Sequence, residues 1–214
     1  MGRPRSRRGV PHEKREGFSS KRALSVTLKM HPFARRLRTR KLYAALRRAF
    51  CRSCAVFSSG ARFRLVHYSV QHSHVHLIVE ANCRADMTWG MRSVNNTLAK
   101  AVNSALGRKR GTVLADRYHE RHLTSPRQAR NALAYVLNNY RHHGADRGER
   151  LPQSWIDPFS SARFFDGFQN RSHDPPGEGD PVASPKSWML QCGWKKGGLI
   201  STAYVPGPSQ NYKN

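Results

Sequence analysis

The feature that most constrains the fold of this sequence is a regular change in the spacing of its apolar residues between residues 23 and 144. Apolar residues first alternate with polar ones, then recur three and four positions apart, and this exchange repeats along the segment. Alternation is typical of a half-buried strand, and the longer spacing is typical of an amphipathic helix. The pattern therefore predicts the order β-α-β-β-α-β, followed by one more helix.

The expected strands are residues 23–30, 63–70, 74–80 and 117–123. The expected helices are residues 37–50, 87–105 and 125–144. This order is the split βαβ, or ferredoxin-like, arrangement, an α+β fold in which one antiparallel sheet carries its helices on one face. A further helix follows that unit at its C-terminal end.

Two details of these elements are specific enough to test. The last helix has a capping signal, with Ser125 as N-cap, Pro126 in the first helical position and Gln128 three residues after the cap, and Gly144 is expected to end it. In the strand 63–70, strict alternation predicts that the odd-numbered residues, Phe63 to Ser69, share one face.

Composition sets the two ends of the chain apart from this segment. Residues 1–22 show no apolar periodicity and are rich in Arg, Ser and Gly, which predicts a flexible basic arm. Residues 23–145 form the predicted folded domain. Residues 146–214 are predicted to be a C-terminal extension, with a Pro- and Gly-rich linker near residues 170–187.

The chain is strongly basic, with 38 Lys and Arg against 13 Asp and Glu and a net charge of +25. Such an excess favours a polyanionic partner, above all nucleic acid. No stretch approaches the ~18 consecutive apolar residues of a membrane helix, and the N-terminus lacks the apolar segment of a secretory signal. Composition therefore predicts a cytoplasmic protein without membrane contact.

Two histidines lie two positions apart in the predicted strand 74–80. Because side chains alternate between the faces of a strand, His74 and His76 point to the same side. Two imidazoles on one face can bind one divalent metal ion, and the same spacing also fits a hairpin that merely exposes histidines. Glu80, further along this face, is interpreted as an exposed residue at the strand end, with an orienting role toward an imidazole as the alternative.

Tyr135 and Asn139 lie four residues apart in the last predicted helix and therefore share one of its faces. If that face covers the histidines, the Asn139 amide is a candidate third metal ligand and the Tyr135 phenol reaches a metal-bound group. The alternative is that Tyr135 is an ordinary half-buried tyrosine of the core.

Together these motifs resemble the single-tyrosine HUH transposases of bacterial insertion sequences, and especially their REP-associated (RAYT) relatives. The resemblance spans residues 22–144. It rests on the strand with His74 and His76, the basic strand 117–121 and the helix segment 135–139. His-x-His alone is common, but its combination with the tyrosine helix in this order of elements is specific. Tyr140 departs from the pattern, because relatives often have proline after the asparagine.

The resemblance implies a function and a set of roles. In this family two histidines bind Mg²⁺ or Mn²⁺ together with a polar residue four positions after the tyrosine, and the tyrosine attacks a DNA phosphate. It implies that His74, His76 and Asn139 hold the metal and that Tyr135, on a catalytic helix, is the nucleophile. The expected protein is a metal-dependent endonuclease and strand transferase, a transposase, that cleaves and rejoins single-stranded or hairpin DNA through a 5′-phosphotyrosine.

The resemblance also implies a bacterial cytoplasmic protein associated with the nucleoid. The chain itself leaves monomer and homodimer both open, since members of the family differ in this respect.

Two other functions fit parts of the sequence. The spacing of Cys51, Cys54, His67 and His72 is that of a two-Cys, two-His zinc finger, a DNA-binding module without catalysis. Against it, such a finger carries its cysteines on a hairpin and its histidines on a helix, whereas Cys51 and Cys54 end a helical pattern here. The other alternative is a non-catalytic DNA- or RNA-binding protein with the same ferredoxin-like fold.

Overall fold

The computed structural model describes residues 18, 22–57, 62–146, 148, 150–169, 173–176 and 180–206. Of the predicted basic arm it describes Phe18 and Arg22, and the rest of that prediction lies outside the described residues. None of the described helices combines the length and the apolarity needed to cross a bilayer.

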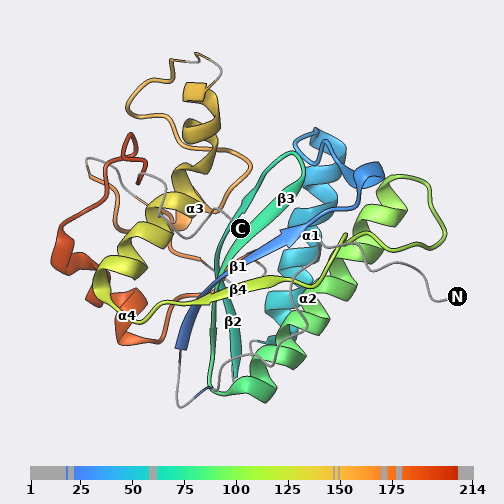
Figure 1. The fold of residues 1–214 in the computed structure, drawn as a ribbon, viewed down its shortest axis with the longest axis horizontal. Coiled ribbons are helices and arrows are strands. Elements are labelled where there is room, and N and C mark those ends of the chain that lie inside the picture. Colours follow the sequence, from blue (N-terminus) through green and yellow to red (C-terminus); the bar gives the residue numbers. More distant parts are fainter. Residues whose placement is uncertain are drawn as a thin grey trace, which may run out of the picture.

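A four-stranded antiparallel sheet forms the centre of the molecule (Figure 1). Its strands are β1 (Arg22–Lys29), β2 (Phe63–Val70), β3 (His74–Ala81) and β4 (His119–His122). They lie in the order β2-β3-β1-β4, so β3 and β1 are the central strands. This is the strand order of a split βαβ unit, and the predicted α+β, ferredoxin-like fold is confirmed.

Helices cover both faces of this sheet (Figure 1). The helices of the split βαβ unit, α1 (Arg40–Phe57) and α2 (Arg84–Ala105), pack on one face, where they share a buried cluster with Leu24, Val26 and Leu77. The additional helix α3 (Pro126–Asp146) packs on the other face over Ala23 and Ile78. Strands β1, β2 and β3 therefore each contribute side chains to both of two cores.

A β-bulge interrupts the predicted alternation in β2. The register to β3 shifts between Leu65 and His67, so that Val66 is the extra residue. As a result Phe63 and Leu65 lie in the α1–α2 core, whereas His67 contacts the ring of Phe165 on the α3 side. The expectation that Phe63, Leu65 and His67 share one face is wrong, because a bulge reverses the facing of every later residue.

Helix α3 begins as predicted and ends later than predicted. The Ser125 hydroxyl accepts a hydrogen bond from the Gln128 backbone N–H at 3.2 Å. The Gln128 side chain in turn accepts from the N–H and hydroxyl of Thr124, one residue before the cap. Gly144 does not end the helix, which continues to Asp146.

The C-terminal extension folds back over α3. It contains α4 (Trp188–Gln191) and the short 3-10 helices Ala162–Phe164 and Gly193–Gly197, and its buried side chains join the α3 core, among them Phe165, Phe168, Trp194 and Ile200. Within the predicted linker, the Ala183 N–H donates to the Leu65 carbonyl at 2.8 Å. This part of the linker therefore lies against β2.

Glu80 holds the extension to the sheet. Its carboxylate is buried and accepts hydrogen bonds from the backbone N–H groups of Lys186 at 2.8 Å and Ser187 at 2.9 Å. The expectation of an exposed strand-end glutamate is wrong. The reason is that a segment without apolar periodicity covers the end of β3, where it supplies two N–H donors that compensate the buried charge.

Candidate active site

His74 and His76 lie side by side on the α3 face of β3. Their ring centroids are 4.6 Å apart in an edge-on arrangement. The Nδ1 atom of His76 lies 3.1 Å from the Thr27 hydroxyl on β1, and that of His74 lies 3.2 Å from the Ser73 hydroxyl. A neighbouring hydroxyl thus engages each ring at Nδ1, an arrangement in which Nε2 is the nitrogen able to coordinate a metal ion.

Helix α3 brings Tyr135 against this pair. The Tyr135 ring lies edge-on to the His76 ring, with 5.1 Å between centroids and 75° between planes. Tyr135 is half-buried and His76 is 4% exposed. The tyrosine predicted as nucleophile and a histidine predicted as ligand therefore meet across the sheet–helix interface.

Asn139 lies one helical turn after Tyr135 and is almost completely buried, at 1% exposure. Neither its Oδ1 nor its Nδ2 atom finds a hydrogen-bond partner within the described part of the chain. A buried amide left in this state costs about 1–3 kcal/mol, and native proteins rarely leave one without a partner such as an ion or an ordered water. This amide fits the expectation of a ligand position.

The extension fixes α3 from its outer side. Next to Asn139, the Asn138 amide donates to the carbonyls of Ser201 at 3.1 Å and Tyr204 at 2.7 Å. One turn further along, the Arg141 guanidinium donates to the carbonyls of Leu151, Pro152 and Trp155. These backbone contacts set the position of the helix that carries Tyr135.

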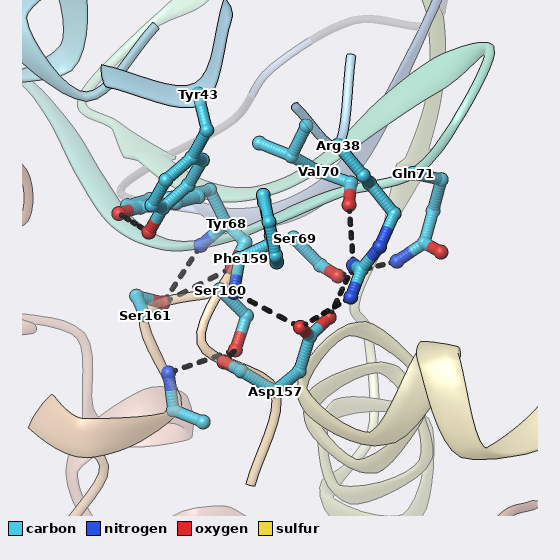
Figure 2. Close-up of polar contacts among 11 residues, drawn as sticks. Arg38, Tyr43, Tyr68, Ser69, Val70, Gln71, Asp157, Phe159, Ser160 and Ser161 are labelled. Carbon is cyan, nitrogen blue, oxygen red and sulfur yellow. Dashed lines mark hydrogen bonds and ion pairs between the residues drawn. The ribbon is translucent and has the colours of Figure 1, made fainter. Parts of the chain in front are cut away.

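A buried ion pair joins the extension to the sheet beside this site (Figure 2). Arg38 donates to both carboxylate oxygens of Asp157, at 2.7 and 2.8 Å, and to the Val70 carbonyl at 2.9 Å. The side chains of the pair are 6% and 0% exposed. Nearby, the Gln71 amide donates to the hydroxyl of Ser69, which pairs with His76 in the sheet.

The same guanidinium occupies a slot between two aromatic rings. Its Cζ lies 4.0 Å from the ring centroid of Tyr140 and 4.4 Å from that of Phe159. Tyr140 is the residue that departs from the family pattern, and α3 passes through it without interruption. Here a tyrosine packs the helix against Arg38, a contact between distant segments that no local pattern in the sequence predicts.

The structure does not bring the zinc-finger residues together. Cys51 and Cys54 lie in α1, and burial raises the pKa of the Cys54 thiol to about 12. His67 is in β2, with Nδ1 at 3.1 Å from the Ser161 hydroxyl. Within the described ranges, no three His, Cys, Asp or Glu side chains are grouped to hold a metal. The Asn139 amide belongs to a donor type outside that set.

The sheet and site define a class of protein: a ferredoxin-like α+β domain with paired histidines on a central strand and a tyrosine helix across them. Neither a protein-family model nor a curated protein sequence matches the chain.

Among solved structures, a REP-associated tyrosine transposase bound to a REP hairpin shares this fold. Its TM-score is 0.51 and its sequence identity 18%, over 71% of this chain and 82% of that one. A candidate transposase from Deinococcus radiodurans R1 aligns at 14% identity and a TM-score of 0.39, over 65% and 99% of the two chains. The first of these two structures confirms the likeness to RAYT proteins at the level of the fold.

Proposed function

We propose that this protein is a transposase-type enzyme that cleaves and rejoins single-stranded or hairpin DNA, with Tyr135 as the nucleophile. The observation that carries the proposal is the contact of the Tyr135 ring with His76, one helical turn from the buried Asn139 amide. A phenol, paired imidazoles and an amide oxygen on facing elements supply a nucleophile and the ligands of one divalent ion, which together are sufficient for a metal-assisted phosphoryl transfer.

The metal ligands in this proposal are His74, His76 and Asn139, and the ion is Mg²⁺ or Mn²⁺. The buried Asn139 oxygen, which has no hydrogen-bond partner among the described residues, supports this choice of ligands. An amide oxygen suits Mg²⁺ and Mn²⁺, and the identity of the ion follows the resemblance to the HUH transposases. When bound, the ion supplies positive charge that stabilises the transition state at the phosphate.

The covalent step belongs to Tyr135. Its phenolic oxygen attacks the phosphorus, an O–P bond forms, and the bond from phosphorus to the 3′ oxygen breaks. The phenolic proton leaves to solvent, and the departing oxygen takes up a proton to become a free 3′-hydroxyl. Attack by a hydroxyl on the phosphotyrosine reverses these changes, so the bond energy is conserved without a nucleotide cofactor.

Two observations support DNA as the substrate: the positive net charge of the protein and the fold that it shares with a transposase. The net charge of +25 is suited to a polyanion, and the transposase that shares the fold was solved with a REP hairpin. The expected affinity falls steeply with salt, because neutralising phosphates releases counterions.

The test incubates the protein with a pool of single-stranded hairpin DNAs and Mn²⁺ or Mg²⁺, then searches for a covalent adduct by denaturing gel and mass spectrometry. We expect a metal-dependent adduct on Tyr135 that is absent from Tyr135→Phe and from His74→Ala/His76→Ala. Tyr204→Phe, which removes an exposed phenol on the same side of the sheet, is the matched control and keeps the adduct. An adduct that survives in Tyr135→Phe would overturn the proposal.

A further inference from the structure

An open groove runs between α1 and α2. These two helices cover one face of the sheet, and Tyr135 lies on the opposite face. Four exposed cations rim the groove, Lys41, Arg48 and Arg52 from α1 and Lys100 from α2. Its floor consists of small side chains, among them Ala45 and Ala101. The groove takes no part in the candidate active site.

The residues of α1 that line the groove form one stripe. Lys41, Ala45, Arg48 and Arg52 are spaced four, three and four residues apart, which places them on one face of the helix, and three of the four are cations. The stripe is about 16 Å long at 1.5 Å per residue. A nucleic-acid duplex presents about ten phosphates over that length.

No acidic side chain neutralises this stripe within the described part of the chain. Helix α1 contains no Asp or Glu, and α2 contains Asp86 alone, near its start. Arg47, next to Arg48 in the sequence, is engaged with Asp180 at 3.7 Å, whereas none of the four rim cations forms an ion pair with a described residue. Among the described residues, no ion pair therefore compensates the positive charge of the rim.

The lining of the groove indicates which form of nucleic acid it fits. Sites for single strands combine cations with aromatic side chains on which bases stack, and no aromatic side chain among the described residues lines this groove. Cations above a floor of small residues contact phosphates without reading bases. This chemistry matches the backbone of a duplex.

We propose that the α1–α2 groove binds the phosphate backbone of double-stranded DNA, such as the stem of a hairpin, while the opposite face handles the single strand at Tyr135. The choice of DNA rests on the proposed function, and the assignment of the groove rests on its own charge and lining. The enzyme then recognises structured DNA through two separate surfaces.

The experiment measures fluorescence anisotropy with a DNA hairpin and with a single strand of the same length that cannot pair, without divalent metal. The groove variant is Arg48→Glu/Arg52→Glu. The control variant is Lys186→Glu/Lys196→Glu, which makes the same change in net charge at exposed positions of the extension. Circular dichroism confirms that both variants fold.

We expect the groove variant to lose affinity for the hairpin on the order of tenfold or more at moderate salt. Its plot of log affinity against log salt concentration becomes less steep by about 2, one unit for each lost phosphate contact. Its affinity for the single strand, and both affinities of the control, change by much less. Because no cleavage is measured, this result holds whether or not Tyr135 forms an adduct.

Three outcomes would overturn the inference. Equal losses in the groove and control variants would show an effect of net charge alone. Equal losses for hairpin and single strand would assign the groove to single strands. Tighter binding of an RNA hairpin than of the DNA hairpin, with the loss in the same variant, would assign it to RNA.

Discussion

The ring of Tyr135 in α3 lies edge-on to the ring of His76 in β3, with 5.1 Å between their centroids. Helix α2 and strand β4 separate the two residues along the chain, so the contact exists only because α3 returns across the sheet. Through this contact the proposed nucleophile and a proposed metal ligand restrain each other. The residues that orient each of them are therefore as informative as the pair itself.

Thr27→Val should weaken metal binding while leaving the fold intact. The Thr27 hydroxyl lies 3.1 Å from His76 Nδ1, and it can accept the Nδ1 proton that a ligand coordinating through Nε2 must carry. Loss of such an orienting partner costs about 10–100-fold in metal affinity. Titration with Mn²⁺, followed by electron paramagnetic resonance, measures this change.

Ser25→Ala is the matched control for that variant, because Ser25 lies two residues earlier on the same face of β1. We expect it to bind Mn²⁺ as the parent protein does. Equal affinities of Thr27→Val and Ser25→Ala would show that the Thr27 hydroxyl does not orient the imidazole.

Asn139→Leu should make the protein more stable and abolish the metal-dependent adduct. The Asn139 amide is 1% exposed and lacks a hydrogen-bond partner among the described residues, so a leucine, which has the same branching and no polar atoms, removes a buried polar group without breaking a hydrogen bond. We expect urea denaturation to show a gain of about 1–2 kcal/mol in the free energy of unfolding. A stabilised, inactive variant is the mark of a residue retained for function.

The neighbouring substitution Asn138→Leu should act in the opposite direction. It removes hydrogen bonds to the carbonyls of Ser201 and Tyr204, and we expect it to lower the free energy of unfolding by about 1–3 kcal/mol. A loss of similar size in Asn139→Leu would mean that the Asn139 amide is satisfied, and would remove the support it gives to a metal site.

The sequence made the fold and the local parts of the site predictable, because both depend on short-range periodicity. Alternating residues identified β1 and β3, and the i, i+4 spacing placed Tyr135 and Asn139 on one face of α3. The bulge at Val66 was not predictable, since the sequence on either side alternates equally well in both registers. Contacts between distant segments, such as Arg38 with Asp157, leave no periodic signal in the chain.

Asp157→Asn should destabilise the protein by about 3–5 kcal/mol, because it leaves the Arg38 guanidinium buried without its counter-charge. The pair is 6% and 0% exposed and makes two hydrogen bonds of 2.7 and 2.8 Å. Urea denaturation gives the change in the free energy of unfolding. The double variant Arg38→Met/Asp157→Leu, which removes both charges, should lose much less. A loss below about 1 kcal/mol in Asp157→Asn is the size expected of an exposed pair and would contradict this account.

His67 should make the protein less stable as the pH falls from 7 toward 4. Burial lowers the pKa of its imidazole to about 4 in the folded protein, against an ordinary value of 6.5. Between these two values the unfolded chain binds a proton that the folded chain does not, so the free energy of unfolding decreases as the pH falls through this window. The full effect of this one group is about 3 kcal/mol.

His67→Asn, which has no proton to gain, should flatten the dependence of the urea midpoint on pH between 6.5 and 4. His173→Asn replaces an exposed histidine and is the control for the substitution itself. An unchanged slope in His67→Asn would show that the acid sensitivity arises from other groups.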